Sequence, residues 1–113
     1  MRVFDHRDVE SVVAEEGASN LRIRWLITKD MGADNFAMRL FEMAPGGFSP
    51  LHEHPWEHEV YILEGEGVAV GMDGKKAFRE GTVVFVPAGE RHQFRNTGQV
   101  AVRFLCMIPY KKT

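Results

Sequence analysis

Residues 46–67 of the chain read GGFSPLHEHPWEHEVYILEGEG, and residues 81–96 read GTVVFVPAGERHQFRN. These two stretches contain four of the five histidines, namely His52, His54, His58 and His92. Alternate residues of an extended chain face the same side, so the three histidines of the first stretch can share one face, although Pro55 is expected to bend the chain there. A second strand can bring the fourth histidine to the same point. Because neutral imidazole is the commonest side-chain ligand for transition metals, this pattern predicts a divalent metal site.

Glycine and proline divide the rest of the chain into short apolar segments. Turn signals fall at residues 44–47, 64–67, 73–74, 87–90 and 96–98. The segments between them are rich in Val, Ile and Phe. Short strands at regular spacing, with turn residues between them, are typical of a sandwich or a barrel. The predicted fold class is therefore all-β.

Six segments are expected to be strands, at residues 21–28, 36–43, 59–63, 68–72, 82–86 and 100–108. The first alternates clearly, and its apolar face comprises Leu21, Ile23, Trp25 and Ile27. Asp73-Gly74 favours a two-residue hairpin turn. Asn96 is placed to cap the turn that follows it with its side chain. Residues 8–16 either form a short helix or belong to an N-terminal arm, and the sequence leaves both open.

Length and composition favour one domain without a nucleic-acid or membrane partner. The 113 residues predict a single domain, with residues 1 to about 20 as an N-terminal arm or edge strand and residues 21–113 as the barrel. The net charge of −2 gives no reason to expect nucleic acid or an anionic membrane as partner. No apolar run approaches the ~20 residues that span a bilayer, and the first residues lack a signal-peptide pattern. With one cysteine, Cys106, no internal disulfide can form, and a cytoplasmic protein is expected.

The spacing of glycines and histidines resembles the two motifs of the cupin family. The pattern G-x5-H-x-H-x3-H-x6-G runs from Gly46 to Gly65, with His58 at the position usually held by glutamate. The pattern G-x5-P-x-G-x2-H-x3-N runs from Gly81 to Asn96 and matches at every fixed position. The resemblance implies a double-stranded β-helix, the jelly-roll barrel of cupins, with one divalent ion inside. It implies the ligands His52, His54, His58 and His92.

The whole chain is similar to very small four-histidine bacterial cupins that bind manganese. Three further stretches carry this closer likeness, at residues 35–41, 54–58 and 104–109. By resemblance they imply a homodimer and an oxidative type of chemistry, with manganese or iron as the expected metal. Nickel, zinc or copper can replace these ions in purified protein, because imidazole sites bind them more tightly. The resemblance does not supply a substrate.

Histidine in place of glutamate at position 58 changes the charge of the site. Three histidines and a glutamate would leave a divalent site at about +1, whereas four neutral histidines leave about +2, which favours an anionic ligand. Glu57 and Glu59 flank His58 and are alternative ligands. Both lie one residue away from the motif spacing and have the opposite strand parity.

Five residues are expected to shape a small-molecule pocket beside the metal: Arg39, Trp56, Phe104, Cys106 and Ile108. The last three share one face of the segment 100–108 by alternation. Phe104 and Ile108 could equally be plain core residues, and Cys106 a buried inert thiol. Arg39 lies among apolar residues, so its charge needs either an internal partner or a substrate carboxylate.

Three functions remain open from the sequence. The first is a metal-dependent oxygenase, because four ligands on an octahedral ion leave two positions for substrate and dioxygen. The second is a non-catalytic module that binds a small ligand through the metal. The third is a metal-dependent isomerase, which would need Glu57, Glu59 or Tyr61 as general base.

Overall fold

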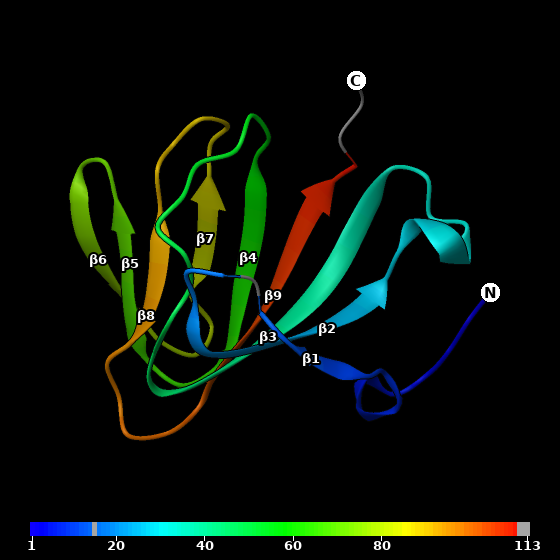
Figure 1. Cartoon of the computed structure of the whole chain (residues 1–113), viewed down its shortest axis with the longest axis horizontal. Helices are drawn as coiled ribbons and strands as arrows, with labels where there is room; N and C mark the ends of the chain where they lie inside the picture. Colours follow the sequence, from blue (N-terminus) through cyan, green and yellow to red (C-terminus); the bar gives the residue numbers. More distant parts are fainter. Residues whose placement is uncertain (15, 111–113) are drawn as a thin grey trace.

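The computed structural model describes residues 1–14 and 16–110, and over this part of the chain it is a single curled antiparallel sheet (Figure 1). The strands are β1 (Ser11–Val13), β2 (Ser19–Ile27), β3 (Phe36–Phe48), β4 (His58–Glu64), β5 (Gly67–Gly71), β6 (Gly74–Phe78), β7 (Val83–Val86), β8 (Gln93–Asn96) and β9 (Val102–Pro109). Two short 3-10 helices, η1 (His6–Asp8) and η2 (Lys29–Met31), complete the elements. The predicted all-β class is confirmed.

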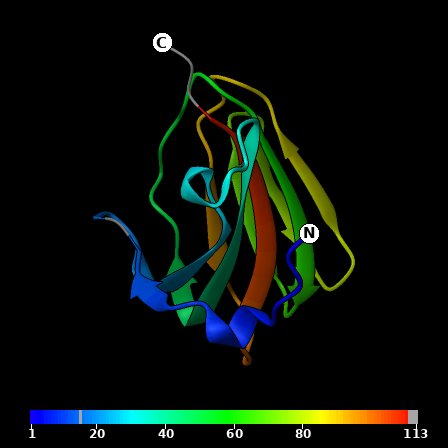
Figure 2. The same ribbon diagram turned by 90° about the vertical axis from the view of Figure 1, so that its right-hand side faces the viewer.

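The strand order is β6-β5-β8-β3-β9-β4-β7, with β2 paired to β3 and β1 paired to β2. Figure 1 shows the sheet from the β5–β6 hairpin at one side to the β1–β2 hairpin at the other. In Figure 2, at right angles to this view, β3 and β9 run side by side along the molecule, and eight residue pairs join them. The sheet curls around an apolar core that includes Phe41, Met43, Ile62, Phe94 and Phe104.

The third strand is longer than predicted. The turn expected at residues 44–47 is wrong, because β3 continues to Phe48, which pairs with Arg95 of β8. Gly46 has φ +80°, a left-handed conformation that glycine adopts at little cost, and this lets the strand bend without ending. One strand can therefore pair with β2 and β9 in its first part and reach β8 with its last residue.

The second strand changes face near its end. Leu21 and Ile23 are buried as predicted, but Trp25 is 43% exposed and Leu26 is buried in its place. The pairing of β2 with β3 shifts register between Trp25 and Ile27, and such an irregularity reverses which side chains face inward. Strict alternation through Ile27 was therefore wrong.

Two further elements refine the predicted turns. The hairpin near Asp73 is confirmed, but Gly74 already pairs with Gly71, so its loop residues are Met72 and Asp73. The strands β6 and β8 were absent from the six expected segments. Asn96 caps its turn as expected: its Oδ1 accepts from the Gly98 amide at 2.9 Å, and its Nδ2 donates to the carbonyls of Met43 and Val100, each at 2.9 Å.

The N-terminal segment does not form the helix considered over residues 8–16, of which residue 15 lies outside the described part. Instead β1 pairs with β2, which sets Val12 opposite Ile23 and packs it against the core. Arg24 of β2 attaches the N-terminal segment to the sheet, because its Nη1 donates to the Val9 carbonyl at 2.6 Å. Among the described residues no helix is long and apolar enough to cross a membrane.

Candidate metal centre

The four histidines come from two motifs that backbone hydrogen bonds tie together. His52 and His54 lie between β3 and β4, His58 is the first residue of β4, and His92 directly precedes β8. The His52 amide donates to the His92 carbonyl at 3.2 Å, and the His92 amide donates back at 2.9 Å. The Gly89 amide donates to the His54 carbonyl at 2.7 Å. These bonds bring the two motifs into contact.

The segment between His52 and His58 bends at Pro55 and Trp56, as the proline predicts. Exposure nevertheless alternates along it, because every residue at an even position from 52 to 58 is less exposed than its odd-numbered neighbours. The bend therefore leaves the three imidazole rings on the inner side of the chain.

The four rings gather at one place. Ring centroids are 4.3 Å apart for His52–His54, 4.9 Å for His52–His92, 4.8 Å for His58–His92, 5.3 Å for His54–His58 and 6.2 Å for His54–His92. Since a metal lies about 2.1 Å from a histidine nitrogen, two rings on one ion have centroids roughly 4.5 Å apart at right angles and at most ~6.5 Å apart when opposite. The observed separations are of this size.

The ring nitrogens themselves are not yet arranged as ligands. Within residues 1–14 and 16–110, no three His, Cys, Asp or Glu side chains are disposed so as to hold a metal ion. The distances between the rings suit a shared ion. To bind it, the histidine side chains would have to rotate about their torsion angles. Such rotations do not alter the backbone bonds described above.

The Nδ1 atoms of His92 and His58 both lie close to an internal partner. Nδ1 of His92 lies 2.9 Å from the Glu90 carbonyl oxygen, which can only accept, so the proton sits on Nδ1 and the lone pair on Nε2. Nδ1 of His58 lies 3.5 Å from Sγ of Cys106. Nε2 of His58 is buried and has no hydrogen-bond partner in the described structure. A buried imidazole nitrogen without a partner fits a metal ligand, because an ion would satisfy it.

The environment favours neutral imidazole. Burial lowers the pKa of His58 to about 3, and charge repulsion from His92 and Arg39 adds to the shift. Burial also lowers the pKa of His52 to about 4, with further repulsion from His54 and His92. Neutral rings are the form that binds metal.

The cavity bordered by the four rings has a free volume of about 50 Å³. Of the five predicted pocket residues, Arg39, Phe104 and Cys106 line it, and Phe41 and Phe94 add apolar surface. Trp56 does not line it but stacks on His54. Ile108 lies farther along β9 and packs against the core.

Arg39 brings a positive charge to this cavity. Its Nη2 donates to Sγ of Cys106 at 3.0 Å, and its guanidinium lies 4.8 Å from the ring centre of Phe41 and 5.4 Å from that of Trp25. Its Nε is buried and unpartnered within the described residues. The internal partner expected for this charge is thus a sulfur and two aromatic faces, and no ion pair with a described carboxylate is formed.

The alternative ligands and bases lie elsewhere. Glu57, Glu59 and Tyr61 are exposed, and none of them lines the cavity. One contact that the sequence does not predict is that of the Glu90 backbone carbonyl with His92. No side-chain pattern could have revealed it, because every residue carries the same carbonyl group.

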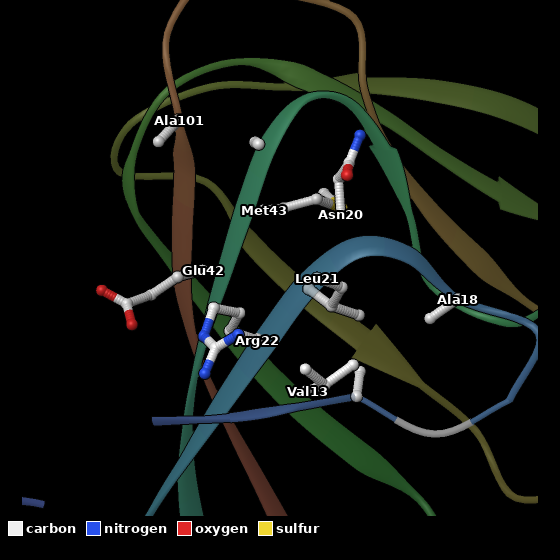
Figure 3. A pocket seen from close by; sticks show the side chains of 10 residues that line it. Val13, Ala18, Asn20, Leu21, Arg22, Glu42, Met43 and Ala101 are labelled. Carbon is white, nitrogen blue, oxygen red and sulfur yellow. The ribbon is translucent and has the colours of Figure 1, made fainter. Parts of the chain in front are cut away.

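A second, larger hollow of about 550 Å³ lies by β1, β2 and β3 (Figure 3). Figure 3 shows Val13, Leu21, Arg22, Glu42 and Met43 among the residues around it. Its charged groups have partners: Arg22 donates to Ser11, and Glu42 accepts from Arg24 and Arg103. None of the predicted site residues lines it.

Comparison with known proteins identifies the family. The cupin domain family matches residues 39–108, more than half of the chain. A 1-methylthio-D-xylulose 5-phosphate methylsulfurylase of Rhodospirillum rubrum is 39% identical over 71 residues, which are 63% of this chain and 46% of that protein. The chain thus spans about half the length of this relative. An oxalate-binding protein of Thermotoga maritima is 34% identical over 96 residues, which are 81% of this chain and 78% of that protein.

Solved structures give the same result for the whole fold. The polyketide cyclase RemF from Streptomyces resistomycificus superposes with a TM-score of 0.91 at 37% identity, covering 98% of this chain and 80% of that chain. The predicted jelly-roll barrel is thereby confirmed. The chain belongs to the cupin family.

Proposed function

We propose that this cupin binds one divalent metal ion, manganese or iron, through His52, His54, His58 and His92, and uses it to oxidise a small organic anion with dioxygen. The observation that carries the proposal is the gathering of four imidazole rings around a cavity that also receives Arg39. The buried, unpartnered Nε2 of His58 supports a metal at this point. When bound, such an ion supplies Lewis acidity, redox capacity and open positions for small molecules.

The ligand is expected to be anionic. Four neutral imidazoles leave the full charge of a divalent ion, and the guanidinium of Arg39 adds another positive charge beside them. In the described structure no carboxylate forms an ion pair with Arg39, and its Nε has no partner. An arginine binds a carboxylate through two parallel hydrogen bonds, so this side chain would bind and orient the ligand.

The ligand is also expected to be small. Pockets for drug-sized molecules usually measure about 300–1,000 Å³, whereas the free space here is about 50 Å³. A two- or three-carbon acid is a suitable size, and the Thermotoga relative is named as an oxalate-binding protein. A polyketide chain, the substrate class named for the Streptomyces neighbour, would need more room than this cavity offers. The apolar walls from Phe41, Phe94 and Phe104 would exclude water from the bound acid.

A second candidate is binding without turnover. The same small cavity and the oxalate-binding relative favour it, because capture of an anion needs only the metal and Arg39. Isomerisation is less favoured, since none of the three candidate bases lines the cavity. A homodimer and a cytoplasmic location remain predictions from the sequence.

The test starts from protein loaded with manganese or iron, and from three single variants. One ion per chain is expected for the wild type and for His6→Ala, whose ring contacts Arg103 away from the cavity. His58→Ala should lose the ion. Arg39→Met should keep the metal but lose the thermal stabilisation that oxalate gives the wild type.

Dioxygen uptake with oxalate and small oxo acids then separates the two candidates. Metal-dependent uptake supports the oxygenase, and ligand-induced stabilisation without uptake supports the binding module. Retention of a full equivalent of metal by His58→Ala, or equal stabilisation of Arg39→Met by oxalate, would overturn the assigned site.

A further inference from the structure

We infer that Cys106 is a positioning residue for the metal centre: its sulfur holds Nδ1 of His58, so that Nε2 of the same ring faces the cavity. The inference rests on the proposed function, because it assigns His58 to the metal. It differs from the family motifs, which contain no position for this cysteine.

The sheet register places Cys106 between the two strands that matter. β9 lies between β3 and β4, and Cys106 on β9 is paired with Arg39 on β3 and with Val60 on β4. His58 is two residues before Val60, so its side chain is on the same face of the sheet. The sulfur therefore meets Arg39 from one side and His58 from the other.

The contacts agree with this placement. Nη2 of Arg39 donates to Sγ at 3.0 Å, and Nδ1 of His58 lies 3.5 Å from the same sulfur. Cys106 is 3% exposed and His58 is 6% exposed, so water does not compete for these contacts. The bond from Arg39 also restrains the sulfur, because the guanidinium is itself packed over Phe41.

The chemistry requires such a partner. A neutral imidazole that binds metal through Nε2 carries its proton on Nδ1, and that proton needs an acceptor when it is buried. For His92 the acceptor is the Glu90 carbonyl at 2.9 Å. For His58 the described structure offers the sulfur of Cys106. Cys106 is thus the acceptor for the Nδ1 proton of His58, as the Glu90 carbonyl is for the Nδ1 proton of His92.

The competing interpretation is an inert core thiol, and it makes a different prediction. A residue that only fills space can be replaced by one of similar volume, such as valine, without effect on the ring. A hydrogen-bond acceptor cannot be replaced by valine, but it can be replaced by serine.

The experiment compares Cys106→Val, Cys106→Ala and Cys106→Ser. The control is Val60→Ala on β4, which removes buried volume beside Cys106 without removing a partner of His58. Two properties are measured: the dissociation constant for Co²⁺ by competition with a chelator, and the imidazole ¹⁵N shifts of His58 in the metal-free protein.

The wild type is expected to show a single His58 tautomer with the proton on Nδ1. The valine and alanine variants should show mixed tautomers and bind Co²⁺ about 10- to 100-fold more weakly. Serine should restore the tautomer and most of the affinity, and Val60→Ala should lower only the thermal midpoint.

The outcomes also separate this inference from the proposed function. Wild-type affinity and an unchanged tautomer in Cys106→Val would overturn the role of Cys106 and leave the metal site intact. Failure of the wild type to bind any metal would overturn the proposed function, and the tautomer measurement would then still decide whether the sulfur orients the ring.

Discussion

The indole of Trp56 stacks on the imidazole of His54, with ring centroids 4.4 Å apart and planes 6° from parallel. Trp56 comes directly after the bend at Pro55, and its Nε1 is buried without a hydrogen-bond partner in the described structure. The stacked face is therefore the contact by which Trp56 acts on the site. It restrains the orientation of a ring that approaches His52 and His58 as well.

Removal of this stacking should loosen the metal centre. We expect Trp56→Ala to weaken divalent metal binding about tenfold, because an unrestrained ring loses rotamer freedom on binding. Trp56→Phe keeps an aromatic face and should lie close to the wild type. Competition with a chelator gives the affinities, with Phe85→Ala at an exposed position of β7 as a matched control. Equal affinities for the alanine variant and the wild type would contradict a restraining role.

The depressed histidine pKa values predict a pH-dependent stability. Burial lowers the pKa of His52 to about 4 and that of His58 to about 3, while the ordinary value in an unfolded chain is 6.5. Between these values the unfolded chain binds protons that the folded chain does not, so the free energy of unfolding falls as the pH drops through this window. For the metal-free protein we expect a loss of about 2 kcal/mol per histidine at about pH 5.

Urea unfolding at several pH values measures this effect, and the two histidines should add nothing to the slope above about pH 7. A variant with both His52→Gln and His58→Gln should have a flatter profile between about pH 7 and pH 5. If the wild type and this variant show the same slope, the two rings are not the cause. Protonation of these two ligands should release metal from the wild type only near about pH 4, because the ligands must be neutral and the folded chain keeps His52 and His58 neutral above that pH.

Phe104 should be the most costly core position tested by truncation. It is 2% exposed, and its ring stacks on Phe41 at 4.9 Å and lies 5.2 Å from Phe94. Phe104→Ala should lower the free energy of unfolding by about 3–5 kcal/mol, because it leaves a cavity at the centre of the core. Denaturant unfolding measures it. A loss no larger than that of Phe85→Ala, which is 57% exposed, would show that the core is not continuous there.

Glu42 should matter more than its surface position suggests. Its two oxygens face Arg24 at 3.0 Å and Arg103 at 3.1 Å, and all three side chains are at most 30% exposed. Glu42→Gln leaves two guanidiniums without a counter-charge and should cost about 1–3 kcal/mol. Thermal unfolding is the measurement. Asp73→Asn, which breaks the exposed pair with Lys76, is the control and should have no measurable effect.

Much of the site could be predicted because its signals are local. The spacing of His52, His54 and His58 predicts that all three face inward. The motif that ends at Asn96 predicts the fourth histidine of the site. The face of β9 was also predicted, since Phe104 and Cys106 are buried on the side that alternation gave them. These features depend only on neighbouring residues in one extended segment.

The path of β3 and the inward face of β2 could not be predicted from residues that are adjacent in sequence. The continuation of β3 through Gly46 and the change of face between Trp25 and Leu26 depend on how β3 pairs with β2 and β8. Local proline and glycine residues predicted a turn in the first case, and local periodicity predicted unbroken alternation in the second. Both errors arose where a register shift or a left-handed residue overrides the period of a strand.

The amino-acid sequence by itself determined the strand periodicity, the histidine spacing and the family, because these are written in residues close together along the chain. Only the tertiary structure decided that Cys106 lies between Arg39 and His58, 67 and 48 residues away in sequence. It also decided that the cavity is small. The physical reason is that sheet register, which no single segment contains, sets which distant side chains meet and how much space remains between them.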